Sequence, residues 1–456
     1  MQSQLARWSA AAPRVAMVLV TLVPALACTT ATPARYAAMA EDWRLSEATI
    51  RVVPGGDRLF EGVPVLERRA LVQRVLERNP NLRAARQAWR AALARFPQVT
   101  SLDDPMLGAG IAPRSIGSSR VDSAPRFVLS QKLPFPGKLR LRGEVALGEA
   151  EAASHDHAAV RLRLATMASL LFDEYVLGAR VLEINHTHVR LLEEFQRIAT
   201  VRYEAGQASQ QDPLQAEVEL AHAVHRDIVL GAAFRITAQQ INALLHRPTD
   251  RALPRPPSRS VVPDVPAGPP DELISEALRQ RPELAAARAR VTADQARVDL
   301  ARREYFPDVT VTGAYNRLWQ ARDLQPFVGL QLNVPLRLGR RKAAVDEADA
   351  RLEQAKSRRL AIEDDVRLAV RSGAERLTEA RHVVRIFRDR LLPAARDQVE
   401  AARAGFESGR NSFLALIDAE RNLLGVELAY EEGLADLGRR RAELDRAVGR
   451  IPGVTW

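Results

Sequence analysis

The chain has 456 residues, of which 27% are charged and 5% are aromatic. This composition is typical of long helices and helical bundles, and it is too polar for a polytopic helical membrane protein. The formal net charge is +10. The arginines are interleaved with glutamates and aspartates and form no basic blocks, which argues against a nucleic-acid-binding protein.

Residues 1–27 have the pattern of an export signal peptide. Arg7 and Arg14 precede a short apolar run, and an Ala-Leu-Ala sequence ends at position 27, as expected for a cleavage site. The apolar run is shorter than the ~20 residues that span a bilayer. Cleavage removes both arginines, so the mature chain carries +10 − 2 = +8.

Cys28, the only cysteine, directly follows this signal. Its position resembles the lipid acceptor of bacterial lipoproteins, which makes Cys28 a candidate lipidation site. The other interpretation is an ordinary cleavage site beside an unmodified thiol. A single cysteine excludes an internal disulfide. Residues 28–64 show no strong periodicity, and we expect a mostly irregular N-terminal arm.

The most informative feature is an internal duplication. Arg78–Arg86 (RNPNLRAAR) recurs as Gln280–Arg288 (QRPELAAAR), and Gly206–Ser209 (GQAS) recurs as Gly409–Ser412 (GRNS). The chain is therefore predicted to contain two homologous halves. The predicted boundaries are a first repeat at 65–250, a proline-rich linker at 251–271, a second repeat at 272–450 and a C-terminal tail at 451–456.

Each half is predicted to run helix, strand, strand, long helix, helix, with the first helix opening after Pro80 or Pro282. In the second half, Val309–Asn316 and Phe327–Val334 alternate between apolar and polar residues. In the first half, the strand patterns are weaker, and Gln131 interrupts an apolar side; these strands are Met106–Ile111 and Phe127–Leu133. Such alternation indicates strands between two environments, either a protein core and water or lipid and a wet lumen.

The helices have a longer pattern. From Lys138 to about Ala205 there is no proline, and apolar residues recur at spacings of three, four and seven. This predicts one helix with a continuous packing seam, roughly 100 Å long at ~1.5 Å per residue. The second half repeats the pattern from Arg340 to Ala404, with a break expected at Pro393. Each long helix is expected to turn at a glycine and return, over 213–246 and 413–448.

Four strands cannot close a barrel, because about eight is the smallest useful number, and lipid does not tolerate an open sheet edge. If these strands span a membrane, several copies must contribute, and three copies would supply twelve strands. The predicted fold class is mainly α with a small β part. It consists of two tandem halves with long antiparallel coiled-coil hairpins and four transmembrane β-strands per chain.

Several segments together resemble the TolC-like outer-membrane factors. They are the duplicated Pro-x-Leu-x-x-Ala-Arg start, the segment Leu133–Lys138 (LPFPGK) and the stretch from Leu391 to Glu420, and the similarity covers essentially residues 65–450. It implies a homotrimer with a twelve-stranded barrel in outer-membrane lipid and an α-helical tunnel through the periplasm. It also implies a periplasmic adaptor and an inner-membrane efflux pump as partners. The LPFPGK segment is most similar to members associated with heavy-metal efflux.

In this family, acidic side chains at the periplasmic helix turns ring the channel gate. The resemblance places Asp418 on one ring position, whereas the other falls on Ala415. It places Asp212 at a position used for closing contacts, so Asp418 and Asp212 are the implied gate residues. Taken without the resemblance, Asp418 is equally compatible with a solvated residue or with an ion pair to Arg421, three positions along the helix.

Two histidine pairs, His155 with His157 and His186 with His188, invite a metal-site interpretation. Residues two apart on a helix point roughly 200° apart, so neither pair can easily share one ion. We expect ordinary surface histidines. The sequence also contains no phosphate-binding loop after a strand and no nucleophile elbow. We therefore predict no enzyme activity, no cofactor and no metal site.

The resulting interpretation is an outer-membrane channel of a tripartite efflux or type I secretion system, a passive exit duct for substrates such as metal ions or drugs. Its expected location is the cell outer membrane, with a periplasmic helical tunnel and an N-terminal lipid anchor. One alternative is a periplasmic adaptor, although adaptors flank their hairpins with small β-domains. Another is a periplasmic coiled-coil scaffold, which would not need alternating strands with aromatic borders.

Overall fold

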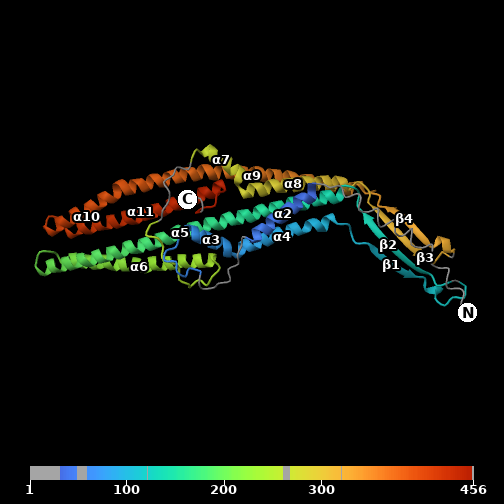
Figure 1. Ribbon diagram of the computed structural model, residues 1–456. Helices are drawn as coiled ribbons and strands as arrows, with labels where there is room; N and C mark the ends of the chain where they lie inside the picture. Colours follow the sequence, from blue (N-terminus) through green and yellow to red (C-terminus); the bar gives the residue numbers. More distant parts are fainter. Residues whose placement is uncertain (1–30, 49–58, 121, 260–267, 320, 454–456) are drawn as a thin grey trace. The chain divides into compact units, whose positions relative to one another are not determined.

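The computed structural model describes residues 31–48, 59–120, 122–259, 268–319 and 321–453 (Figure 1). The predicted export signal and Cys28 lie outside the described residues. Within them, the chain divides into two compact units. Unit 1 contains Arg90–Ala150 and Thr292–Asp349 with the N-terminal segment, and unit 2 contains the rest. Each unit therefore takes segments from both halves of the sequence.

The two halves contain corresponding elements in the same order, except that the long helix of the second half is divided into α9 and α10 (Figure 1). The first half contains α3 (Arg68–Arg78), α4 (Pro80–Thr100), β1 (Met106–Ile111), β2 (Pro125–Leu133), α5 (Lys138–Glu204) and α6 (Gln211–Leu244). The second half contains α7 (Pro270–Gln280), α8 (Pro282–Arg303), β3 (Val309–Asn316), β4 (Pro326–Leu332), α9 (Leu338–Ile386), α10 (Leu392–Glu407) and α11 (Phe413–Val448). The short helices α3 and α7 were not predicted.

The long helices follow their predicted bounds closely. Helix α5 runs for 67 residues without interruption. In the second half, the expected break at Pro393 takes a milder form, because a π-helical turn at Phe387–Leu391 joins α9 to α10. Pro393 then lies in the first turn of α10, where its missing N–H has little consequence. π-Helical turns are rare and occur mostly as single turns inside α-helices, as this one does.

The prediction of an irregular N-terminal arm was wrong, because Ala31–Ala48 forms helix α2. The segment is rich in alanine, the strongest helix former, and tertiary contacts within unit 1 hold it. The Tyr36 ring stacks on Phe96 with centroids 4.7 Å apart, Met39 packs on the same cluster, and the Arg90 guanidinium lies 5.2 Å from the Trp43 ring centroid. The segment forms a helix although its apolar residues show little helical periodicity, so the sequence pattern did not predict it.

A four-stranded antiparallel sheet in unit 1 joins the two halves. The strand order is β1-β2-β3-β4, and the central pairing of β2 with β3 brings Leu133 opposite Val309. Each half therefore supplies one hairpin, and the hairpins meet at the centre of the sheet. The predicted strands are confirmed within two residues at each end.

In unit 2, each half builds a similar apolar cluster beneath its short helix. In the first half, Leu71 and Val75 of α3 pack with Phe172 and Ile241. In the second, Leu273 of α7, Val370 and Leu444 belong to one cluster. The short helices α3 and α7 thus cover apolar residues of the long helices and bury them.

Candidate functional site

The sheet has two chemically different faces. In antiparallel pairing, directly opposite residues lie on the same face, so the register assigns every strand residue to a side. One face is almost wholly apolar: Leu107, Ala109, Ile111, Pro125, Phe127, Leu129, Leu133, Val309, Val311, Tyr315, Pro326, Val328, Leu330 and Leu332, with Gly313 and Gln131. The other is mainly polar or small: Gly108, Gly110, Arg126, Ser130, Lys132, Thr310, Thr312, Ala314, Asn316, Gly329 and Gln331, with Met106, Val128 and Phe327.

The apolar face is strongly exposed in the single chain. Leu107 is 78% exposed and Leu330 is 74% exposed. The one polar member, Gln131, donates its side-chain amide to the Asp103 carbonyl at 2.7 Å, so it is satisfied at the end of the strand. A continuous exposed apolar patch of this kind marks contact with lipid or with another protein.

The two outer strands, β1 and β4, each pair on one side only within the chain. An unpaired edge in lipid leaves backbone N–H and C=O groups without partners, which costs several kcal/mol per group. Because strand direction alternates across the four strands, β4 of one copy can pair antiparallel with β1 of the next. The sheet is therefore suited to closure by additional copies.

Where the sheet meets the long helices, a buried charge cluster joins the two halves. Lys138, only 1% exposed, begins α5 and donates from Nζ to Asp308 Oδ1 at 2.8 Å, to Glu304 Oε2 at 3.0 Å and to the Phe306 carbonyl at 3.0 Å. Asp308 also accepts from the Phe135 backbone N–H at 3.0 Å. All three donors of the ammonium are thus satisfied, as a buried lysine requires.

An aromatic stack covers this cluster. The Phe135 and Phe306 rings stack with centroids 4.7 Å apart, and the Arg303 guanidinium lies 5.4 Å from each centroid. Gly137 has a φ of +92°, and a Cβ there would lie 3.1 Å from the Arg303 guanidinium. The LPFPGK segment therefore has a structural explanation: it turns the chain from sheet to helix against the second half.

At the other end of the long helices, both hairpins turn at glycines in the left-handed conformation, Gly206 at φ +71° and Gly409 at φ +72°. A shared apolar cluster holds the two hairpin ends together, and it includes Phe195, Phe406 and Leu416. The Arg202 guanidinium lies 4.6 Å from the Phe406 ring centroid. The two turns therefore form one packed tip within unit 2.

The predicted gate residues both lie at this tip. Asp418, in α11, has a side chain that is 59% exposed, and its Oδ1 lies 3.5 Å from Arg421 Nη1. Asp212 lies in the first turn of α6, where burial raises its pKa while the Arg202 guanidinium acts in the opposite direction. The two carboxylates lie on different hairpins, and none of the described hydrogen bonds or ion pairs joins them.

The tip also contains a charged link that sequence reasoning missed. Arg421 is ion-paired with Glu219 of α6, so the same arginine contacts Asp418 on its own helix and the hairpin of the first half. This contact lowers the pKa of Glu219, chiefly through the hydrogen bond from Arg421. Neither residue stands out from the helix-surface pattern, and only the packing of α6 against α11 reveals the link.

The histidines are not all surface residues. His188 is 3% exposed; its Nδ1 contacts Glu420 and its Nε2 lies 3.1 Å from Glu427 Oε2. His186, two positions earlier, is half exposed and pairs with Asp227 of α6 at 2.7 Å. The two side chains point to different helices, as predicted, but the expectation of surface histidines was wrong for His188, because its side of α5 packs against α11.

In the first pair, His157 is half-buried. His157 Nε2 is buried without a hydrogen bond, and its ring lies 6.0 Å from the Trp89 ring. Burial lowers the pKa of His157, and the nearby guanidiniums of Arg161 and Arg86 lower it further. Within the described residues there is no group of three or more His, Cys, Asp or Glu side chains arranged to hold a metal ion.

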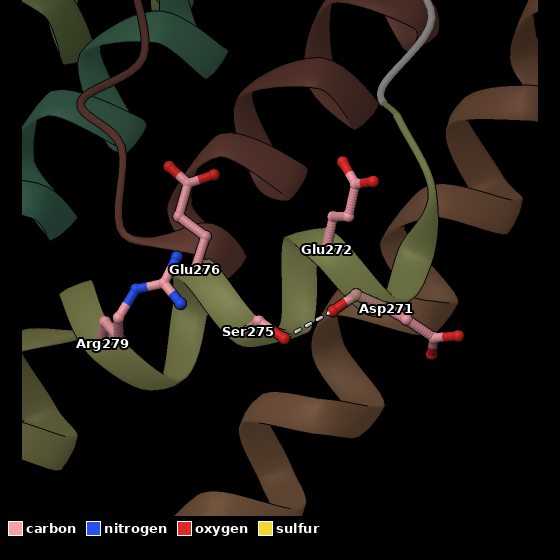
Figure 2. Close-up of a pocket in the computed structure, with 5 residues that line it drawn as sticks. All are labelled: Asp271, Glu272, Ser275, Glu276 and Arg279. Carbon is pink, nitrogen blue, oxygen red and sulfur yellow. Dashed lines mark hydrogen bonds between the residues drawn. The ribbon is translucent and has the colours of Figure 1, made fainter.

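A shallow surface depression follows one face of α7, lined by Asp271, Glu272, Ser275, Glu276 and Arg279 (Figure 2). Two of its three carboxylates already have partners. Asp271 pairs with Arg371 at 2.9 Å, and Glu276 pairs with Arg450, whose hydrogen bond lowers the pKa of Glu276. A single exposed helix face of this kind has no converging groups for catalysis or for ligand capture.

Across the described part of the chain, no helix combines the length and the apolar character that crossing a membrane requires.

Comparison with known proteins agrees with this architecture. The family model described as "Outer membrane efflux protein" matches residues 273–450. The cobalt-zinc-cadmium resistance protein CzcC of Cupriavidus metallidurans is 26% identical over 255 residues, which is 55% of this chain and 59% of the relative's length. The outer membrane protein OprJ of Pseudomonas aeruginosa is 26% identical over 421 residues, covering 84% of each chain.

Solved structures show the same fold. The outer-membrane channel OprN matches with a TM-score of 0.73 at 20% identity, over 88% of this chain and 97% of that one. CusC matches with a TM-score of 0.72 at 18% identity, over 88% and 98%. VceC of Vibrio cholerae matches with a TM-score of 0.73 at 18% identity, over 84% and 96%. The chain is therefore similar to the outer membrane efflux proteins over residues 273–450, and it has the fold of the solved outer-membrane channels.

Proposed function

We propose that this protein is the outer-membrane channel of a tripartite efflux system, a passive exit duct without catalytic activity. Three copies close a twelve-stranded barrel in the outer membrane, and their long hairpins continue as a tunnel through the periplasm. An inner-membrane pump delivers substrates through a periplasmic adaptor. Energy and substrate choice then come from the pump, and this chain supplies the path out.

The observation that carries this proposal is the two-faced sheet with open edges. Its apolar face is exposed, its opposite face is mainly polar or small, and both outer strands have free edges. In a barrel, the apolar face meets lipid and the polar face lines a wet lumen. Twelve strands enclose an interior wider than side chains can fill, because eight strands already approach that limit.

The names of two relatives support a proposal about the substrate class. CzcC is named for cobalt, zinc and cadmium resistance, and TtgC of Pseudomonas putida is named a toluene efflux pump outer membrane protein. We propose metal ions or drugs as the exported substrates. The residues of the lumen bind none of them tightly, since strong binding would slow release.

The gate is proposed to lie at the hairpin tip. In a trimer, three exposed Asp418 carboxylates would face one axis, and Asp212 would contribute to closing contacts. Three carboxylates around a narrow aperture attract cations. The ion pair between Arg421 and Glu219 supports this assignment, because it ties the Asp418 helix to the hairpin of the other half at the same level.

We also propose that Cys28 carries a lipid anchor at the mature N-terminus. Described structure begins three residues later with α2, which packs in the same unit as the sheet. Mass spectrometry of the mature N-terminal peptide tests this proposal. A diacylglyceryl adduct on Cys28 is expected, and an unmodified cysteine at the terminus would contradict it.

The channel function is tested by purifying the full mature protein in mild detergent and adding it to planar lipid bilayers. Discrete, stable conductance steps are expected. The matched preparation is Leu330→Lys, which places a charge on the apolar face of β4 and should insert poorly. If the unaltered protein gives no conductance at any concentration, the channel proposal is wrong.

A further inference from the structure

The lumen side of the sheet has an unbalanced charge. Among all residues on this face of the four strands, Arg126 and Lys132 are the charged ones, and no carboxylate is present. Both lie on β2, six positions apart, so they mark opposite ends of the strand. Lys132 is close to the long helices, and Arg126 is close to the loops that join the strands of each hairpin.

The positive charge near the helices is neutralised. Lys132 Nζ lies 3.5 Å from Asp308 Oδ2, and Lys138 Nζ lies between Asp308 and Glu304. These two lysines and two carboxylates together have no net charge. The charge of Lys132 on the lumen face is therefore offset within this cluster.

The positive charge near the loops is not neutralised. Arg126 is exposed, and its directly opposite neighbours are Gly110 and Asn316. Within the described residues, no carboxylate forms an ion pair with it. Its guanidinium therefore stands free on the lumen face.

The adjoining loops have the same sign. Residues 112–124 and 317–325 contain four arginines and two aspartates, a net charge of 4 − 2 = +2. One arginine is partly offset, since Arg317 Nη2 lies 3.7 Å from Asp122 Oδ2. Together with Arg126, the loop end of each chain carries +3.

We propose that the loop end of the barrel is an anion-attracting mouth and that Arg126 is its selectivity-determining residue. This inference rests on the proposed channel function. In a trimer, three Arg126 side chains form a ring of positive charge directly inside a positively charged rim. Anions and anionic substrates or complexes are concentrated there, and small free cations are partly excluded.

The preference is expected to be modest and to depend on salt. The Debye length is ~10 Å at 0.1 M and ~3 Å at 1 M ionic strength, so charges on the wall of a wide lumen act over most of its width only in dilute salt. The acidic gate ring proposed at the hairpin tip lies in series with the mouth and favours cations, so the effect of the mouth is measured against Arg126→Gln. We expect the chloride-to-potassium permeability ratio of the unaltered protein to exceed that of the variant by a factor on the order of 2 at 0.1 M salt, and the two ratios to converge at 1 M.

The test is the reversal potential of the purified full-length channel in planar bilayers under a potassium chloride gradient. Arg126→Gln should lower the chloride-to-potassium permeability ratio, and Arg126→Glu should lower it further. Arg126→Lys should preserve the ratio of the unaltered protein. Arg259→Gln, which removes the same charge from the proline-rich linker, serves as the matched control and should leave the ratio unchanged.

The outcomes separate the two proposals. A conducting channel whose chloride-to-potassium permeability ratio is the same in the unaltered protein and in Arg126→Gln overturns the anion-attracting mouth and leaves the channel function standing. An absence of conductance in the unaltered protein overturns both. A chloride-to-potassium permeability ratio that Arg126→Gln lowers and Arg259→Gln leaves unchanged establishes Arg126 as the selectivity-determining residue.

Discussion

His188 lies in α5 with one ring nitrogen against each of two carboxylates of α11, Glu420 and Glu427. Burial acts to lower the pKa of the imidazole, but the hydrogen bonds with these carboxylates outweigh burial and raise the pKa to about 9. Glu427 also pairs with Arg396 of α10, whose Nη2 lies 3.3 Å from Glu427 Oε1. At neutral pH the imidazolium therefore bridges the long helices of the two halves.

A raised pKa gives a defined pH dependence. The stabilisation from His188 is fully present below its unfolded pKa of ~6.5, and it is lost as pH rises through about 9. The thermal unfolding midpoint of the unaltered protein should therefore fall between pH 6.5 and 9.5.

In His188→Gln, this pH-dependent loss should disappear, and the variant should be less stable at pH 6.5 by ~3 kcal/mol, because Glu420 and Glu427 lose their buried partner. The half-exposed His186 provides the control, since His186→Gln should retain the pH dependence. Circular dichroism melting curves of all three proteins measure this. An unchanged slope in His188→Gln would show that another group causes the effect.

Asp418 gives a second prediction at this scale. Asp418→Ala should weaken the block of the purified channel by divalent and trivalent cations, since it removes three carboxylates from the proposed gate ring. Asp397→Ala removes the same charge from an exposed position of α10 and should leave the block unaltered. Equal block of the unaltered protein and Asp418→Ala in single-channel recordings would rule out the gate-ring role.

Sequence reasoning reached some of these residues and missed others for a physical reason. Asp418 was found through the family resemblance, and its pairing with Arg421 follows from helical spacing. The contacts of His188 with Glu420 and of Arg421 with Glu219 join residues 232 and 202 positions apart. Periodicity indicates which face of a helix is buried, but not which helix covers that face.

At the scale of elements, the junction between sheet and helices depends on Lys138. Lys138→Met would leave Asp308 and Glu304 without their buried ammonium partner, and removal of one member of a buried pair costs ~3–5 kcal/mol. The control is Lys356→Met, which breaks a surface pair with Glu353 and should cost at most ~1 kcal/mol. Thermal unfolding midpoints distinguish the two, and similar shifts would contradict the structural role of Lys138.

The two faces of β4 allow a sharper comparison between neighbouring residues. Leu330 lies on the apolar face and Gln331 on the polar face. A lysine at the bilayer midplane costs ~2–4 kcal/mol on the lipid side of a barrel, whereas lumen positions tolerate charge. Leu330→Lys should reduce the amount of protein in the outer-membrane fraction, and Gln331→Lys should not. Equal loss in both variants would mean that the apolar face does not meet lipid.

The strands and long helices could be predicted because their periods extend over many residues. The alternation in β3 and the seam of α5 are of this kind. Helix α2 could not be predicted, because contacts such as Tyr36 on Phe96 stabilise it rather than an amphipathic pattern of its own. The proline at position 393 predicted an interruption of the long helix. It did not predict that the interruption takes the form of a π turn before the proline.

At the scale of the whole molecule, the duplication explains why a single chain is incomplete. Each half supplies one β-hairpin, and the two hairpins pair through β2 and β3 to give four strands with two free edges. The sequence could predict four strands and the need for more copies. Closure requires at least two copies, since about eight strands are the smallest useful number. The trimer is the proposal, because nothing within one chain fixes the number of copies.

The most direct measurement is the location and mass of the mature protein after outer-membrane fractionation and mild detergent extraction. The protein should be recovered from the outer membrane, and its protein mass, determined by light scattering corrected for detergent, should correspond to three chains. A monomer or dimer recovered from the soluble periplasm would contradict the channel, because the apolar face of the sheet would then have to be covered by protein rather than lipid.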